Sequence, residues 1–265
     1  MLTIIIVIYK TDKKKLQSIL DKIDINTPII FVVNSLNYNF DGLTISQKYV
    51  LLKCKNNGNG VAINLALKKV KTEYSIYLDV DIFLEKNFFY KITNIAKKIK
   101  DFAILVPNHG NINSKFFFLE KYDGEAAVIF FNMSKLDKIG FFDENFFLYY
   151  EETDLFLRCR NVNEKVYFLP KVIIKHFRAS SIIDKTNKLK YLRSWHYMWS
   201  MFYFYRKNFN YYYALKKTYK FLFYDILKLI FFIICCNSKN IKLRFYRIWG
   251  LISSMMFKKS FLRPN

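Results

Sequence analysis

Several features that would define a protein class are scarce or absent in this chain of 265 residues. Its four cysteines form no C-x-x-C pair and have no histidines at zinc-ligand spacing, which excludes a zinc finger and predicts reduced thiols in a cytosolic compartment. The apolar segment 221–236 is interrupted by Asp225 and Lys228, and it falls short of the roughly 20 apolar residues of a spanning helix. Segment 2–9 has no basic residue before it and no cleavage site after it, so it predicts a buried strand, not a signal peptide. No internal repeat is visible.

Acidic residues are also scarce, because 21 Asp and Glu stand against 43 Lys and Arg, for a formal net charge of +22. This charge requires an anionic partner, and nucleic acid, anionic lipid and phosphate-bearing substrates all qualify. After Asp184 the only acidic residue is Asp225, and aromatic residues are densest in the same region, at 195–205. Since 52% of the residues are hydrophobic, the composition predicts a folded core and argues against disorder.

Strand and helix patterns alternate over the first two thirds of the chain. Strands are predicted at residues 3–8, 29–33, 49–52, 74–78, 103–106, 126–131, 166–169 and 172–174, and helices at 13–23, 61–70, 88–99, 135–139 and 154–160. This alternation predicts an α/β fold with a mostly parallel sheet, whose ligands bind at the carboxyl ends of the strands. From about Asn187 the pattern becomes helical, basic and aromatic. We therefore expect a catalytic domain over residues 1–186 and a helical extension over 187–265.

Polar residues at predicted strand ends are candidates for a metal site. Asp79 and Asp81 follow the strand 74–78, and alternation along an extended chain points both carboxylates to the same side. Two carboxylates suit Mg²⁺ or Mn²⁺, which take oxygen ligands and bridge phosphates. His176 follows the strand 172–174 and could ligate a metal or bind a phosphate. D-x-D also arises by chance at strand ends, and a single histidine is more often structural.

An Asn-Asn-Gly-Asn-Gly sequence occupies residues 56–60 and opens a predicted helix. Its backbone N–H groups and the positive helix end could face an anion or a polar ligand. Such clusters are more often simple turns.

Three carboxylates, those of Glu151, Glu152 and Asp154, crowd beside the aromatic run 146–150. Like charges in an apolar setting predict a raised carboxyl pKa, which suits a general base. The alternative is an acidic helix start, stabilised by the helix dipole and paired with Arg158 or Arg160.

Taken in order, these segments resemble the inverting glycosyltransferases of family 2, especially the bacterial rhamnosyltransferase-like branch that builds surface polysaccharides. The matching segments are TIIIVIYK at 3–10, NNGNGVAIN at 56–64, DVD at 79–81, IGFFDENFFLYYEETDL at 139–155, and His176 followed by Ser180 and Ser181. The resemblance implies a GT-A fold, which is a Rossmann-like nucleotide-binding mixed sheet, here with a C-terminal helical, basic-aromatic extension.

The resemblance also implies roles for individual residues. Asp81 corresponds to the main metal ligand, Asp79 lies nearer the ribose and the metal, and His176 completes the metal shell in some members. Glu152 takes the position of the base beside the acceptor, with Glu151 and Asp154 flanking it as further catalytic candidates. The implied donor-binding residues are Ile8, Tyr9, Lys10, Asn34, Asn57, Gly58, Asn64 and Asp79.

Two departures from the family pattern affect these expectations. The sequence Val33-Asn34-Ser35 lacks the aspartate that helps family members recognise the base, so the identity of the donor base is open. The base position holds Glu152 where aspartate is usual, which extends the carboxylate by one methylene.

The implied reaction is a single displacement with inversion, from a nucleotide-diphosphate sugar to a glycan or lipid-linked glycan acceptor, with Mn²⁺ or Mg²⁺ as cofactor. We expect a cytoplasmic protein that is peripheral on the inner face of the cell membrane, with residues from 187 onward on the anionic surface. The alternative for this segment is a helical appendage packed on the catalytic domain, or a dimer interface. A nucleic-acid-binding protein would leave the ordered acidic motifs unexplained, so we expect no nucleic-acid partner. A nucleotidyltransferase would need a Gly-rich, Lys-bearing loop near Thr11, where none is present.

Overall fold

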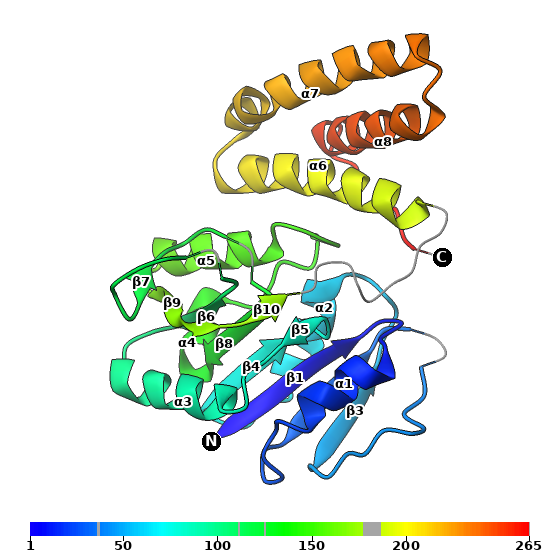
Figure 1. The fold of residues 1–265 in the computed structure, drawn as a ribbon. Coiled ribbons are helices and arrows are strands. Elements are labelled where there is room, and N and C mark those ends of the chain that lie inside the picture. Colours follow the sequence, from blue (N-terminus) through cyan, green and yellow to red (C-terminus); the bar gives the residue numbers. More distant parts are fainter. Residues whose placement is uncertain (36–37, 111, 125, 177–186, 265) are drawn as a thin grey trace. The chain divides into compact units, whose positions relative to one another are not determined.

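A computed structural model of the chain describes residues 1–35, 38–110, 112–124, 126–176 and 187–264 (Figure 1). The chain forms two compact units. The first comprises Met1–Asn56, Val61–Phe142 and Leu155–Ile183, and the second comprises Asn57–Gly60, Asp143–Asp154 and Asp184–Asn265. Because the second unit also takes two short segments from the first 186 residues, the domain division at 186/187 stays a prediction.

The first unit contains an eight-stranded mixed sheet with the strand order β3-β2-β1-β4-β8-β6-β9-β7 (Figure 1). Its strands are β1 (Leu2–Ile8), β2 (Ile29–Val33), β3 (Tyr49–Lys53), β4 (Tyr74–Leu78), β6 (Ile104–Asn108), β7 (Leu119–Glu120), β8 (Val128–Asn132) and β9 (Val166–Ile173). β1 to β4 pair in parallel, whereas β8 runs antiparallel to both of its neighbours. A separate two-stranded sheet pairs β5 (Ile82–Phe83) with β10 (Lys175–His176). The predicted α/β fold class is confirmed.

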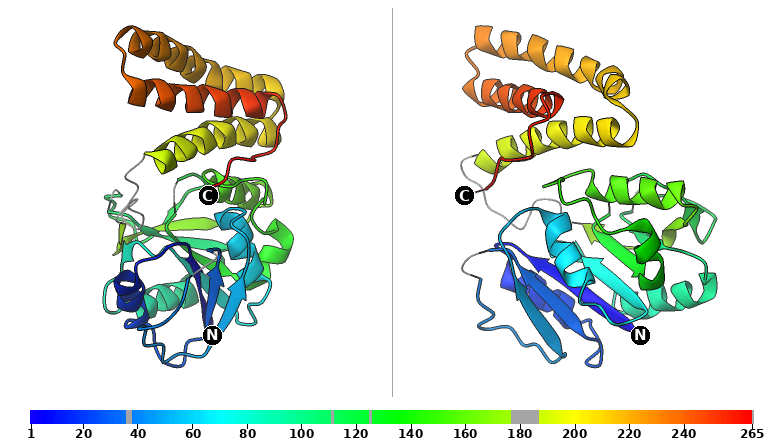
Figure 2. Two further views of the ribbon diagram at one scale, coloured as in Figure 1. Left: turned by 90° about the vertical axis from the view of Figure 1, so that its right-hand side faces the viewer. Right: turned by 180° about the vertical axis from the view of Figure 1, so that it is seen from behind.

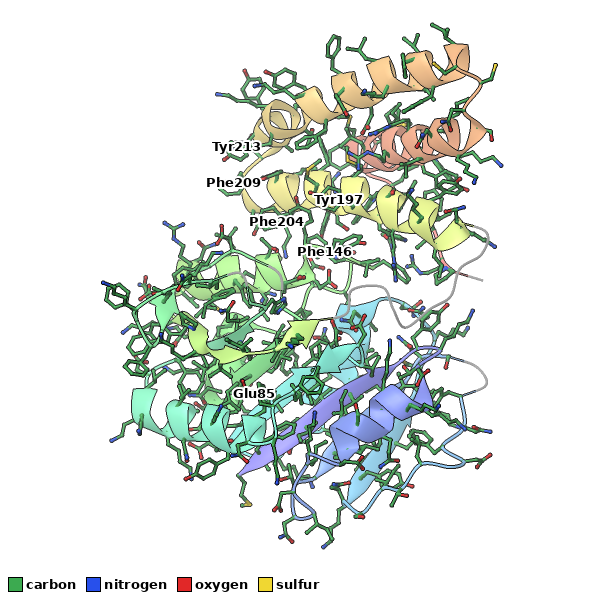
Figure 3. The ribbon with its side chains drawn as sticks, in the orientation of Figure 1. Glu85, Phe146, Tyr197, Phe204, Phe209 and Tyr213 are labelled. Atoms are coloured by element: carbon green, nitrogen blue, oxygen red, sulfur yellow. The ribbon has the colours of Figure 1, made fainter. Side chains whose placement is uncertain are left out.

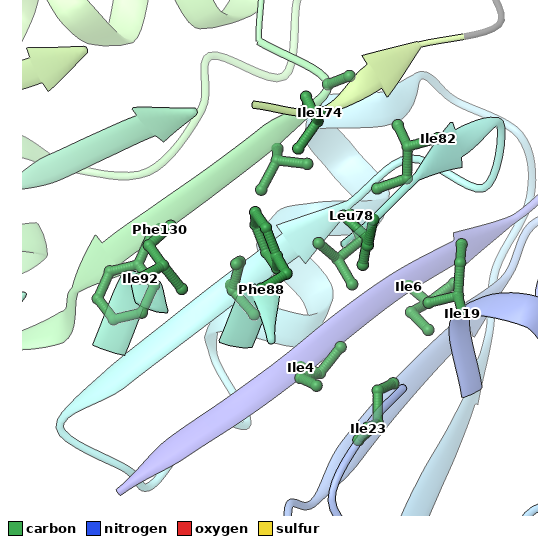
Figure 4. Close-up of a cluster of buried hydrophobic side chains, with 14 of the residues drawn as sticks. Ile4, Ile6, Ile19, Ile23, Leu78, Ile82, Phe88, Ile92, Phe130 and Ile174 are labelled. Atoms are coloured by element: carbon green, nitrogen blue, oxygen red, sulfur yellow. The ribbon is translucent and has the colours of Figure 1, made fainter. Parts of the chain in front are cut away.

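Helices cover both faces of this sheet (Figure 2). They are α1 (Lys13–Leu20), α2 (Asn59–Leu67), α3 (Phe88–Ile99), α4 (Met133–Ile139) and α5 (Glu151–Asn161). Alternate residues of β1 point to opposite faces, so that Ile4 and Ile6 pack with α1 and α3 (Figure 4), whereas Ile5 and Val7 pack with α2, α4 and the part of α5 in this unit. Strands buried on both faces leave the strand ends as the natural places for reactive polar groups.

The structure corrects two of the predicted elements. The sequence predicts separate strands at 166–169 and 172–174, whereas β9 continues through Pro170. Its pairing with β6 is irregular after Leu169, and such a bulge accommodates a proline, which has no N–H to donate. The helix predicted over 154–160 begins at Glu151, because α5 includes the whole acidic cluster in its first turn. The short strands β5, β7 and β10 were not predicted.

Three long helices make up most of the second unit (Figure 2). They are α6 (Lys188–Asn208), α7 (Tyr211–Ile234) and α8 (Ser238–Met255). Their shared apolar core contains Met198, Met201, Phe202, Ala214 and Leu251. Phe209 and Tyr213 stack at the connection between α6 and α7, with ring centroids 4.6 Å apart (Figure 3).

A buried ion-pair network joins α7 to α8. Asp225 is fully buried, and its carboxylate accepts hydrogen bonds from Arg244 at 2.6 Å and from Arg247 at 2.8 and 3.0 Å. A buried carboxylate without such partners would be strongly destabilising, so these two arginines fix the pairing of the helices. Within the described ranges, no helix has both the length and the apolar character that crossing a membrane requires.

Candidate active site

The carboxyl ends of β1, β2 and β4 meet at one edge of the sheet because these strands pair in parallel. Ile8 lies opposite Val33 of β2, and Ile6 lies opposite Leu78 of β4. The carbonyl of Ile8 also accepts a hydrogen bond of 3.1 Å from the backbone N–H of Asn34. The segments that follow the three strands therefore start side by side, although they are far apart in the sequence.

Four side chains that follow β1 and β2 have buried polar atoms with no hydrogen-bond partner in the part of the chain that the structure describes. They are the hydroxyls of Thr11, Ser35 and Tyr38 and the amide oxygen of Asn34. A buried polar group without a partner costs about 1–3 kcal/mol, so four together point to a ligand that supplies the partners. Of the four, only Asn34 is a predicted donor residue. Thr11 and Ser35 also follow strand ends, which is the signal that would have identified them.

The backbone after β1 has an uncommon conformation. Lys10 has φ of 47°, in the left-handed region that residues with a Cβ rarely adopt. Its side chain is exposed, and its ammonium lies 5.5 Å from the centroid of the Tyr9 ring. Such outliers are concentrated at functional sites, which supports the predicted donor contacts of Ile8, Tyr9 and Lys10 without testing them.

Asp79 and Asp81 lie in the turn between β4 and β5. The sequence argument treats this segment as extended, but Val80 and Asp81 form a turn, so strand alternation does not decide where the carboxylates point. The hydroxyl of Tyr77 donates to the Asp79 carboxylate, and the Asp79 backbone N–H donates to the carbonyl of Ala127 at 2.8 Å. Asp81 is buried. Both carboxylates are thus at the edge where β1, β2 and β4 end.

His176 is brought back to this turn by the small second sheet. In the antiparallel pairing of β10 with β5, His176 lies opposite Ile82, the residue directly after Asp81. For His176 the structure describes only the backbone, so its predicted role as a ligand stays a prediction.

The protein groups of this turn fit a hard cation that also binds the substrate. In the described ranges, no cluster of three or more His, Cys, Asp and Glu residues could hold a metal ion by itself. Mg²⁺ and related ions are commonly bound by one or two carboxylates together with substrate phosphates, so a complete protein cage is not required. Asp79 and Asp81 provide two such carboxylates.

Asn64 has a structural role in this unit. Its side-chain amide donates to the carbonyl of Phe142 at 2.9 Å, and its amide oxygen accepts from the Phe142 backbone N–H at 3.0 Å. The side chain is only 2% exposed. These bonds fix the segment that precedes the acidic cluster, and a contact of Asn64 with the donor stays a prediction.

In the second unit, the glycine-containing loop packs closely on the aromatic run. Gly58 has φ of 117°, and a Cβ added there would lie 2.8 Å from the backbone of Phe147. Only glycine fits without moving that backbone. The structure thus brings together two motifs, the loop with Asn57 and Gly58 and the segment that leads into Glu151.

The acidic cluster occupies the first turn of α5. Asp154 is fully buried and Glu151 is 7% exposed, whereas Glu152 is half-buried. Tyr149 and Tyr150, which precede the helix, have φ of 69° and 68° and pack against Tyr197 of α6. Two consecutive left-handed residues are strained, and packing on α6 maintains them. Of the three carboxylates, that of Glu152 is the most accessible.

Lys207 of α6 is the cation that the structure pairs with the cluster. Its ammonium lies 2.7 Å from the carboxylate of Asp154 and 2.8 Å from that of Asp143. Asn208 also donates to Asp154, at 3.0 Å. Burial would raise the pKa of Asp143, but hydrogen bonds from Lys207 and from the Asn145 backbone outweigh it and keep this pKa below its ordinary value. The three carboxylates do lie at a helix start, as the predicted alternative has it, and Asp154 has a cation partner on a distant helix. The choice between this alternative and a general base stays a prediction.

Arg158 and Arg160 are the pairing partners that the sequence suggests for this cluster. Arg158 donates hydrogen bonds to the carbonyls of Ile139, Gly140 and Phe141, at 2.7 to 3.2 Å, and its predicted pairing with the cluster stays a prediction, as does that of Arg160. Sequence alone gave no signal for Lys207, because it is more than fifty positions away.

Comparison with known proteins gives one family match. Residues 40–167 match the family described as Glycosyl transferase family 2, which confirms the predicted resemblance over that segment. No curated protein matches the chain. The mixed sheet with helices on both faces agrees with the GT-A fold, as predicted.

Solved structures of glycosyltransferases share this fold. GalNAc-T7 with UDP, GalNAc and Mn²⁺ has 12% identity and a TM-score of 0.57, over 77% of this chain and 49% of that one. The mannosyltransferase PcManGT of Pyrobaculum calidifontis, in complex with GDP-Man and Mn²⁺, has 11% identity and a TM-score of 0.56, over 97% and 88%. TarS of S. aureus has 12% identity and a TM-score of 0.54, over 93% and 54%. The chain thus spans about half the length of GalNAc-T7.

Lys207→Met tests whether the buried ion pair holds the acidic helix. The substitution keeps most of the apolar length but leaves Asp154 buried without its ammonium partner, so we expect a loss of about 3 kcal/mol in the free energy of unfolding. Lys91→Met, which removes an exposed ion pair with Glu85 (Figure 3), should cost less than about 1 kcal/mol. Urea unfolding followed by circular dichroism measures both.

Adding Asp154→Asn to Lys207→Met removes the buried charge and should recover part of the lost stability. If Lys207→Met were as stable as Lys91→Met, the ion pair would not be what holds this helix.

Proposed function

We propose that this protein is a metal-dependent, inverting glycosyltransferase. It moves a sugar from a nucleotide-diphosphate donor to a glycan or lipid-linked glycan acceptor in bacterial surface polysaccharide synthesis, at the inner face of the cell membrane. The observation that carries the proposal is the joint position of Asn34, Asp79 and Asp81 at the shared carboxyl edge of a GT-A sheet.

Donor binding is assigned to that edge. The partnerless buried atoms of Thr11, Asn34, Ser35 and Tyr38 require hydrogen-bond partners, and a nucleoside offers both donors and acceptors. In α/β sheets of this kind, nucleotides bind outside the carboxyl ends of the strands. The neighbours crystallised with UDP or GDP-Man share the fold and support this assignment.

Asp81 and Asp79 are the proposed metal ligands, with His176 as a further candidate. A divalent cation held there would supply positive charge to offset the charge that develops on the diphosphate as the bond to the sugar breaks. We favour Mn²⁺ or Mg²⁺ because the two carboxylates are hard oxygen ligands, and both GalNAc-T7 and PcManGT were solved with Mn²⁺.

Glu152 is the proposed general base. In a single displacement, the acceptor hydroxyl oxygen bonds to the anomeric carbon as the bond to the diphosphate breaks, and the hydroxyl proton passes to a carboxylate. Glu152 is more accessible than Glu151 and Asp154, and Lys207 already binds Asp154. We therefore assign Asp154 a role in positioning the helix and Glu152 the contact with the acceptor.

Asp81→Ala tests the metal site. A methyl group cannot ligate or neutralise the cation, so nucleotide release from a sugar donor should fall at least about 10²-fold. Isothermal titration should show that binding of the nucleotide diphosphate no longer responds to Mn²⁺. Asp79→Ala should have a smaller effect, and Glu85→Ala, which removes an exposed carboxylate, should have none. Near wild-type turnover of Asp81→Ala with metal present would refute the assignment.

Glu152→Gln tests the base. The amide keeps the shape of the side chain but cannot accept the proton, so kcat should fall by about 10²- to 10⁴-fold while donor affinity stays nearly unchanged. Glu151→Gln is the matched neighbour and should retain most of the activity. If Glu151→Gln were inactive and Glu152→Gln active, the base would be Glu151, and our assignment within the cluster would be wrong.

A further inference from the structure

The outward side of α7 is unusually apolar for a helix in contact with water. Ala214, Thr218 and Asp225 are its buried residues and recur on one side of the helix. The opposite side presents Phe223, Leu227, Ile230 and Ile234, with spacings of four, three and four residues. Phe223 is 64% exposed, Ile230 is 52% exposed and Ile234 is 77% exposed. We call these four residues the α7 face.

Apolar exposure continues beside the α7 face and at the end of the helix. Ile226, Phe231 and Ile233 are also exposed, as are Cys235 and Cys236 just after the helix. A contiguous exposed apolar surface of this kind marks an interaction site.

Basic residues lie beside the α7 face on the same helix. Lys216 and Lys220 are exposed on the same helix, about two turns and one turn before Phe223, respectively. The ammonium of Lys228 lies 5.7 Å from the ring centroids of both Tyr224 and Phe231, which is within cation–π distance. Asp225, the only acidic residue after Asp184, is fully buried and paired with arginines.

The apolar face, the lysines and the aromatic rings together favour one kind of partner. An apolar strip bordered by lysines and by aromatic rings fits the interface of an anionic bilayer, where apolar side chains enter the acyl boundary and ammonium groups meet the phosphates. Nucleic acid would match the charge but not the aliphatic face. A second copy of this chain would match the apolar residues, but it would bring its lysines against the same basic border.

We propose that the α7 face docks the protein on an anionic membrane, with α7 lying in the plane of the lipid surface. The Asp225–Arg244–Arg247 network holds α7 against α8, so the face is presented by a fixed helix pair and does not need to form on binding. The inference rests on the proposed function, because it assigns the surface by which such an enzyme would reach a lipid-linked acceptor.

Vesicle flotation tests the proposal with the full-length protein and phosphatidylcholine vesicles, with or without phosphatidylglycerol. We expect binding that requires phosphatidylglycerol and weakens at high salt. Ile230→Ser/Ile234→Ser should bind at least about tenfold more weakly, because two side chains lose their burial in lipid. Lys216→Gln and Lys220→Gln should each weaken binding about fivefold.

The matched control is Tyr90→Ser/Phe117→Ser, which removes two large side chains that are 73% and 76% exposed elsewhere and should leave binding unchanged. Wild-type protein that stays unbound at both salt concentrations would overturn the proposal, as would equal binding by Ile230→Ser/Ile234→Ser. Light scattering tests the alternative that the partner is a second copy of this chain. If the wild-type protein were a dimer that does not bind vesicles, and Ile230→Ser/Ile234→Ser were a monomer, the α7 face would be an interface between copies.

Metal-dependent nucleotide binding, measured on the same proteins, separates this inference from the proposed function. The α7 variants should bind nucleotide diphosphate like the wild type. Nucleotide binding without vesicle binding refutes the membrane inference alone, whereas vesicle binding without nucleotide binding refutes the proposed function alone.

Discussion

Burial of both faces of the eight-stranded sheet is the constraint on which the candidate site depends. Because α1 and α3 cover one face and α2, α4 and part of α5 the other, β1, β2 and β4 are filled with apolar side chains. Parallel pairing then aligns the strand ends, so that Asn34 and Asp79 start from one edge. In our account, donor and metal binding are consequences of this arrangement, and sugar transfer requires no reactive group inside the sheet.

The excess of basic residues serves different purposes at different places in the second unit. Lys207 points inward and neutralises Asp143 and Asp154, which are close to the proposed base. Arg244 and Arg247 also point inward and hold the α7–α8 pair through Asp225. In our proposal, the exposed lysines of α7 contact an anionic partner. Net charge alone therefore gives the sign of the partner but not its location, which depends on which cations the fold uses internally.

Much of the fold was predictable from the sequence, because strands buried on both faces have a clear β-branched pattern, as in residues 3–8 and 29–33. The turn at Asp81 was not predictable, because side chains alternate between two sides only while the chain stays extended. Thr11 was missed although it follows a strand end, because a buried hydroxyl without a hydrogen-bond partner can be recognised only in the three-dimensional structure. The pairing of Lys207 with Asp154 had no local signal, because tertiary packing joins residues more than fifty positions apart.

The central claim is that the edge formed by β1, β2 and β4 binds a nucleotide-diphosphate sugar through a divalent metal. The most direct test is a screen of UDP-, GDP- and dTDP-sugars, in which release of nucleotide by the purified protein is measured with Mn²⁺ and again with a chelator. We predict release from one nucleotide class that the chelator abolishes. A folded protein that releases nucleotide from none of these donors, or that releases it equally well in chelator, would contradict the account.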